Sequence, residues 1–115
     1  MSIFRNEKPV EQVVHIQGNV HWEVAFDTNA KVYIGLCRML NLNAIGETWI
    51  DFQQSANDAM GALFSDLFQS GEFEKFMQAN GWHSSTLPQR GTTPRFDMPF
   101  AVQRTDRVQE LYAHA

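Results

Sequence analysis

Gly46-Glu47-Thr48 separates a strand-patterned segment from a helix-patterned one. Before it, residues 20–27 alternate between apolar and polar side chains, which is the period of a strand with one buried face. Thr48 and Asp51 form a capping-box pattern that predicts a helix start at this point. The helix period then continues in Trp49, Phe52, Ala56, Ala59, Leu63 and Leu67. A strand region that leads through Gly46 into a capped amphipathic helix predicts a small α+β domain.

Turn-forming residues divide the rest of the chain into further predicted elements. The expected strands span residues 10–17, 20–26, 32–36, 40–45 and 96–104. One expected helix spans residues 48–70 and stops at Gly71, and the other spans residues 72–79 and ends at Asn80-Gly81. In the third strand, Val32, Ile34 and Leu36 are expected to form the buried face. Pro99 should confine the last strand to a sheet edge or to its first residues. The prediction is an antiparallel sheet of three to five strands with both helices on one face, a flexible lead-in over residues 1–9 and a loop over residues 83–94.

The length and composition indicate one soluble globular domain, expected over residues 10–115. The chain has 115 residues, of which 43% are hydrophobic and 19% charged. No apolar run approaches the roughly 20 residues that a membrane span needs, and the first residues do not resemble a secretory signal. Cys37 is the only cysteine, so it cannot form an internal disulfide. We therefore expect a cytoplasmic protein without a membrane segment.

The charge balance favours a basic protein partner over nucleic acid. The formal net charge is −4, whereas nucleic-acid binding draws most of its affinity from the neutralisation of phosphates by Lys and Arg. Four arginines give the C-terminal quarter a local basic bias: they are Arg90, Arg95, Arg104 and Arg107. We favour a solvated surface over a phosphate-binding patch for these four residues.

The sequence contains no convincing catalytic or metal-binding pattern. The four histidines are dispersed and have no metal-ligand spacing, and neither a Gly-rich phosphate loop nor a nucleophile elbow is present. Cys37 lies in a strand pattern, where a small buried hydrophobic residue is the favoured interpretation over a catalytic thiol. His21 and Glu23 share one strand face and could form an acid–base pair, although an exposed polar face explains them equally well. We predict no enzyme activity and no cofactor.

The aromatic content leaves two interpretations open. Nine Phe, three Trp and two Tyr are more than a small core easily buries. Either all of them belong to the core, or some of them form a surface for a partner or a second copy. The candidate partner-binding residues are the aromatic Trp49, Phe64, Phe68 and Trp82 and the acidic Asp58 and Asp66. Because an unpaired strand edge is also expected, we predict a homodimer or a larger assembly.

Residues 22–60 resemble the N-terminal domain of HicB-like antitoxins. The similarity is carried by Tyr33-Ile34-Gly35-Leu36-Cys37-Arg38 and by Gly46-Glu47-Thr48-Trp49-Ile50-Asp51, which match a strand and a helix start of that family. Arg38 stands where the family usually has Pro, and Phe52 where it has Ala. The residues after Phe96 are too few for the DNA-binding module that the family commonly appends, so direct DNA binding is not expected.

The resemblance implies a degraded RNase-H-like domain that covers the active surface of a small basic ribonuclease toxin. On this reading the chain is an antitoxin of a toxin–antitoxin system. Two alternatives remain: an oligomeric α+β module that binds an unrelated protein, and a small enzyme that uses His21 and Glu23.

Overall fold

The computed structural model describes residues 10–113, so the predicted lead-in over residues 1–9 lies outside the described part. The strands are β1 (Val10–Gln17), β2 (His21–Asp27), β3 (Val32–Cys37), β4 (Leu42–Gly46), β5 (His83–Ser84), β6 (Thr92–Asp97) and β7 (Ala101–Arg104). The helices are α1 (Trp49–Gln69), α2 (Phe73–Asn80), α3 (Val108–Ala113) and the 3-10 turn η1 (Arg38–Leu40). The α+β class, with one long helix, is confirmed.

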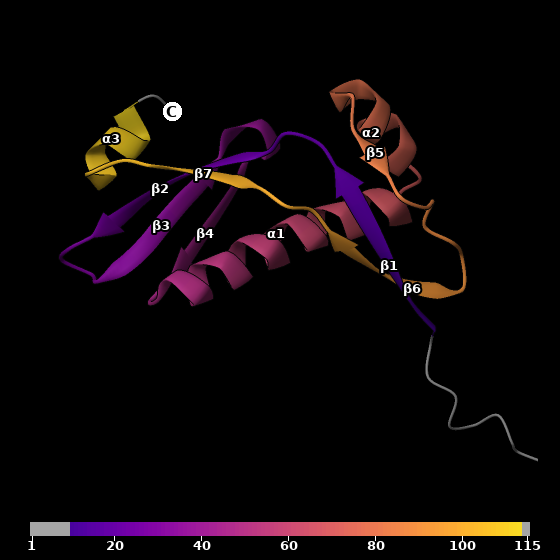
Figure 1. Cartoon of the computed structure of the whole chain (residues 1–115), viewed down its shortest axis with the longest axis horizontal. Coiled ribbons are helices and arrows are strands. Elements are labelled where there is room, and N and C mark those ends of the chain that lie inside the picture. Colours follow the sequence, from indigo (N-terminus) through magenta and orange to yellow (C-terminus); the bar gives the residue numbers. More distant parts are fainter. Residues whose placement is uncertain (1–9, 114–115) are drawn as a thin grey trace, which may run out of the picture.

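The strands form two sheets instead of the single antiparallel sheet that was expected. One sheet has the order β4-β3-β2-β7, and the other has the order β5-β1-β6. β2, β3 and β4 form the expected antiparallel meander, but β7 runs parallel to β2, and β6 runs parallel to β1. The C-terminal strands thus return alongside the first two, as Figure 1 shows. Sequence alternation could not reveal this pairing, because it joins segments from opposite ends of the chain.

α1 is the element that the two sheets share. It contacts β3 and β4 of one sheet and β6 of the other, and Figure 1 shows it extending from beneath the four-stranded sheet to the three-stranded one. The Thr48 hydroxyl accepts a hydrogen bond from the Asp51 amide at 3.0 Å, which confirms the predicted cap. The helix ends at Gln69, with Ser70 as its C-cap, before Gly71 with its positive φ of 79°. Its core-facing side chains are Phe52, Ala56, Met60 and Phe64.

Two glycines allow the start of α1 to pack directly on the four-stranded sheet. A Cβ at Gly46 would lie 2.2 Å from the backbone nitrogen of Phe52, and a Cβ at Gly35 would lie 2.4 Å from the Phe52 ring. Both distances are shorter than any real Cβ contact. Phe52 is fully buried as a result, and it also makes an edge-to-face contact with Trp22 at 6.0 Å between ring centroids.

The predicted inner face of β3 is wrong by one residue. The buried residues of this strand are Gly35 and Cys37, with Tyr33 packed on the core, whereas Val32, Ile34 and Leu36 lie half-buried on the opposite face. α3 packs on β2 and β3, and its Leu111 side chain is fully buried. Because helices cover both faces of this sheet, both faces of β3 are apolar, and alternation does not identify the inner one.

Two corrections concern the C-terminal third. The expected loop over residues 83–94 contains β5 and the first part of β6, because β6 pairs with β1 from Thr92 onward. The expected single strand over residues 96–104 is interrupted between Asp97 and Ala101, at Pro99. The side chain of Gln12 in β1 organises the remaining loop through four hydrogen bonds, to Thr86 Oγ1, the Leu87 carbonyl, the Gln89 amide and Thr92 Oγ1.

Candidate binding surface

The solvent face of α1 is acidic over its whole length. Asp51, Asp58 and Asp66 are exposed, and α1 contains no Lys, Arg or His. Their spacing of seven and eight residues places them on one side of the helix, opposite the buried stripe. Neighbouring members of this row lie about 10–12 Å apart along the helix axis, given a rise of about 1.5 Å per residue. We refer to these three residues as the acidic face.

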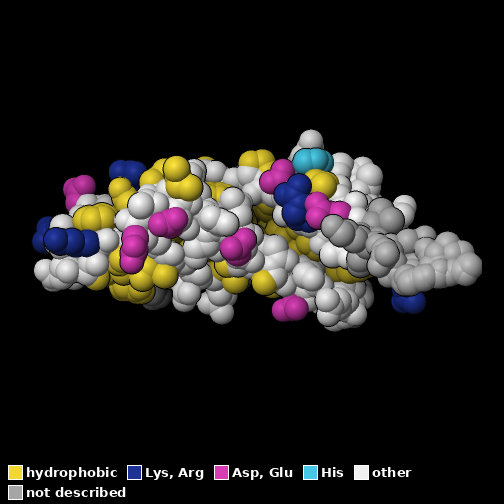
Figure 2. All heavy atoms as spheres, turned by 90° about the horizontal axis from the view of Figure 1, so that it is seen from below, with side chains coloured by type: hydrophobic (Ala, Val, Ile, Leu, Met, Phe, Trp, Pro, Cys, Tyr) yellow, Lys and Arg dark blue, Asp and Glu magenta, His cyan; other side chains and the backbone are white. Residues whose placement is uncertain are grey.

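Figure 2 views the molecule from the side on which α1 lies. To the left of the middle of that view, acidic side chains occur without basic side chains directly beside them. Basic side chains gather at the left end of the view and also just right of its centre, where they lie beside acidic ones and a histidine. Paired charges of that kind occur on β1 and β6, where Arg95 Nε lies 3.2 Å from Glu11 Oε1 and His15 Nδ1 lies 3.1 Å from Asp97 Oδ2. α1 itself contributes no basic residue, but Asp58 borders that region, because it lines a hollow together with Glu11, Arg95 and Asp97.

The four aromatic candidates for a partner surface differ in how deeply they are buried. Phe64 has no exposed surface, and Trp82 is only 5% exposed, so the prediction that they line a surface is wrong for both. Their rings contact each other edge-to-face inside the core, with 6.5 Å between the ring centroids. Trp49 and Phe68 are half-buried and also pack against the core. Of the six candidates, Asp58 and Asp66 are therefore the ones that lie fully on the surface.

Trp49 belongs to a group of rings at the start of α1. It stacks on Phe52 at 5.5 Å and meets Tyr33 edge-on at 5.4 Å. The guanidinium of Arg104 lies 4.6 Å from the Trp49 ring centroid, which is a cation–π distance. Of the four C-terminal arginines, Arg104 is therefore engaged by an aromatic ring, and Arg95 is engaged by Glu11.

His21 and Glu23 share the outer face of β2, as predicted, but Glu23 has another partner. Its carboxylate forms an ion pair with Arg38 Nε, and Arg38 Nη2 donates to the Leu111 carbonyl. Arg38 thereby joins β2 to α3. This arrangement gives Glu23 a role in holding α3 on the sheet.

Cys37 lies in the core with no exposed surface. Burial raises the pKa of its thiol above the ordinary value of 9.0, and hydrogen bonds with the backbone of Leu40 and Met39 partly oppose that shift. The thiol is neutral at physiological pH and inaccessible. Both properties fit a small buried hydrophobic side chain, not a nucleophile.

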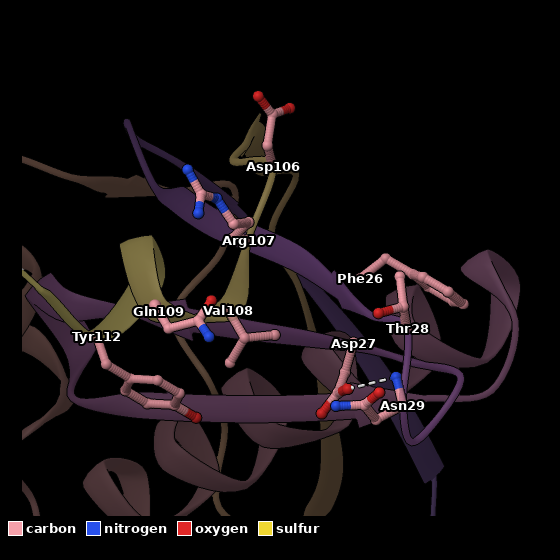
Figure 3. A pocket seen from close by; sticks show the side chains of 9 residues that line it. All are labelled: Phe26, Asp27, Thr28, Asn29, Asp106, Arg107, Val108, Gln109 and Tyr112. Carbon is pink, nitrogen blue, oxygen red and sulfur yellow. Dashed lines mark hydrogen bonds between the residues drawn. The ribbon is translucent and has the colours of Figure 1, made fainter.

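A hollow lies between the β2–β3 turn and α3, and the sequence does not indicate it. It has a volume of about 730 Å³. Figure 3 shows its lining, with Tyr112 and Val108 from α3 and Asp27 and Asn29 from the turn. Asp27 Oδ1 accepts hydrogen bonds from the amides of Asn29 and Ala30, so its carboxylate is occupied in shaping the turn. The lining also includes Asp106 and Arg107, and Figure 3 shows both pointing away from Asp27, so the charged side chains do not converge on one point.

Residues 10–113 offer neither a cluster of metal ligands nor a helix that could cross a membrane. This part of the chain contains no group of three or more His, Cys, Asp or Glu side chains that could hold a metal ion. None of its helices is both long enough and apolar enough to cross a membrane.

Comparison with known proteins found no matching family model, no matching curated protein and no matching solved structure.

Proposed function

We propose that this protein is a non-catalytic binding domain that recognises a basic protein through the acidic face of α1. More specifically, we propose a HicB-like antitoxin that neutralises a small basic ribonuclease in the cytoplasm. The acidic face carries the proposal, because three exposed carboxylates follow one side of a helix that has no basic residue. Such a row of like charges attracts a surface rich in Lys and Arg and speeds its approach.

The chemistry of the proposed target supports this choice. A ribonuclease binds the phosphates of its substrate with basic side chains. A row of carboxylates spaced about 10–12 Å apart offers such side chains an alternative set of negative partners. The protein would then inhibit by covering the basic surface, without any catalytic group of its own.

The order of elements is a second, weaker support. The antiparallel strands β2, β3 and β4 lead through Gly46 into α1. This is the order that the resemblance over residues 22–60 implies. The fold is equally compatible with a binding module for an unrelated partner, which remains the alternative function.

The enzyme alternative receives less support. It requires Glu23 to exchange protons with His21, whereas the Glu23 carboxylate is held by Arg38. We therefore propose no reaction for this chain.

Co-expression tests the proposal. The open reading frame beside the gene of this protein would be expressed alone and together with it. If the neighbour encodes a short basic toxin, we expect co-expression to restore growth and the two proteins to co-purify. Persistent toxicity together with no co-purification would contradict the antitoxin role.

A pair of variants tests whether the acidic face is responsible. Asp58→Asn/Asp66→Asn removes two charges from this face, and we expect it to weaken rescue. The matched control, Glu74→Gln/Asp106→Asn, removes two exposed charges elsewhere, on α2 and before α3. Equal weakening by both variants would mean that net charge matters and that the acidic face does not.

A further inference from the structure

The edges of the two sheets differ in how well they are protected from pairing with another strand. β5 and β6 are the outer strands of one sheet, and β4 and β7 are the outer strands of the other. An unprotected edge offers free backbone N–H and C=O groups to any strand that approaches it, and proteins block such edges with charges, proline or short length.

Three of these four edges are blocked. β5 is two residues long. β6 contains Pro94, which has no N–H to donate, together with the exposed and charged Arg95 and Asp97. β7 is four residues long and ends at the exposed Arg104.

β4 has none of these protections. Residues 39–46 contain no charged residue and no proline, although the chain as a whole carries a net charge of −4. Ile45 is 57% exposed, on the sheet face opposite α1. Two copies of an acidic protein repel each other least where both surfaces are uncharged. The β4 edge is such a surface.

The shape of the surface beside β4 also suits a second copy. A hollow of about 410 Å³ lies at the start of β4, and Leu36, Asn43 and Tyr112 are among the residues that line it. Arg38 also lines it, and the charge of Arg38 is balanced by its ion pair with Glu23. If two β4 strands pair antiparallel about a two-fold axis at Ala44, Ile45 of each copy lies beside Asn43 of the other. The exposed isoleucine of one copy would then lie at the rim of the hollow in the other.

We propose that the protein forms a homodimer in which β4 pairs antiparallel with β4 of a second copy, centred on Ala44. The two four-stranded sheets become one continuous sheet, and each Ile45 packs at the hollow of the other subunit. A two-fold interface of this kind uses the same surface of both copies. This inference does not depend on the proposed antitoxin role.

Measurement of the mass in solution by light scattering, at tens of micromolar, tests the proposal. We expect the wild-type protein to have twice the mass of the chain and Ile45→Lys to have the mass of a single chain. The lysine makes the net charge less negative, so increased overall repulsion cannot explain a loss of the dimer. Leu87→Lys is the matched control, because Leu87 is 56% exposed but lies in the loop after β5. We expect it to remain dimeric.

Hydrogen exchange of the wild-type protein provides a second test that needs no variant. We expect amides within residues 42–46 to become more protected as the protein concentration rises, while those of β6 do not change. A monomeric wild type, or a dimer that persists in Ile45→Lys without concentration-dependent protection of β4, would overturn the proposal. Asp58→Asn/Asp66→Asn should remain dimeric, which separates this interface from the acidic face.

Discussion

The two sheets hold α1 by different kinds of contact. At the four-stranded sheet, the helix start meets the strands backbone to backbone, because Gly46 leaves no room for a side chain beside Phe52. At the three-stranded sheet, the helix is held through rings: Phe64 contacts Trp82 and Phe96, and Trp82 lies over Gly18. Backbone contacts cannot adjust without moving an element, whereas a ring can rotate. We therefore expect the first contact to be rigid and the second to tolerate change.

Gly46→Ala should have the largest effect. The added Cβ would lie 2.2 Å from the Phe52 backbone nitrogen, so α1 must shift relative to β4. We expect a loss of about 3 kcal/mol or more in the free energy of unfolding, measured by urea denaturation. Gly61→Ala on the same helix is the control, because a Cβ at Gly61 has no neighbouring atom within 4 Å. It should be neutral or slightly stabilising.

Gly18→Ala should cost less than Gly46→Ala. Its Cβ would lie 2.3 Å from a carbon of the buried Trp82 ring, so that side chain must shift, but the three nearest atoms all belong to this side chain and none is backbone. We expect a loss of about 1–2 kcal/mol in the same measurement. If Gly18→Ala proved as damaging as Gly46→Ala, the distinction between a rigid and an adaptable contact would be wrong.

Thr48→Ala removes the cap at the rigid end of α1. The Asp51 amide then loses the hydroxyl that accepts its hydrogen bond at 3.0 Å. We expect a loss of about 1 kcal/mol in the free energy of unfolding. Thr48→Ser keeps the hydroxyl and should retain most of the stability. Equal losses for both substitutions would show that the methyl group matters more than the cap.

Cys37, in the four-stranded sheet, should make a small pH-dependent contribution to the free energy of unfolding. Its buried thiol has a raised pKa, so above pH 9.0 the unfolded chain loses the thiol proton before the folded protein does. The unfolded state then binds fewer protons, and stability falls as the pH rises. Half a pH unit above pH 9.0, we expect the free energy of unfolding to have fallen by less than about 1 kcal/mol. Cys37→Ala should not show this fall. Comparing the two proteins removes the effect of other titrating groups. If both had the same pH dependence, the thiol would not be responsible.

The same two regions differ in how far sequence predicts them. The meander β2–β3–β4 and the start of α1 depend on neighbouring residues, and their turns, cap and helical period could all be identified. The three-stranded sheet depends on the pairing of β1 with β6, which no local pattern indicates. The assignment of Phe64 and Trp82 to the surface failed for the same reason. Both rings are covered by elements that come together only through this distant pairing.

For the candidate site, charge could be predicted better than aromatic exposure. A carboxylate at a helix position opposite the buried stripe lies in solvent whatever the tertiary structure is, and Asp58 and Asp66 do so. An aromatic ring beside the stripe is buried or exposed according to what packs next to it. The position of the hollow at β4 likewise depends on α3, which crosses the sheet from the far end of the chain.

The rate constant for association with the basic partner tests the central claim most directly. Electrostatic attraction by the acidic face would raise the rate at which the two proteins meet. We expect association of the wild-type protein to slow steeply as the salt concentration rises, while dissociation changes little. Asp58→Asn/Asp66→Asn should associate more slowly and show a weaker salt dependence, and Glu74→Gln/Asp106→Asn should behave like the wild type. Association that is independent of salt, or equally slowed by both double variants, would contradict recognition through the acidic face of α1.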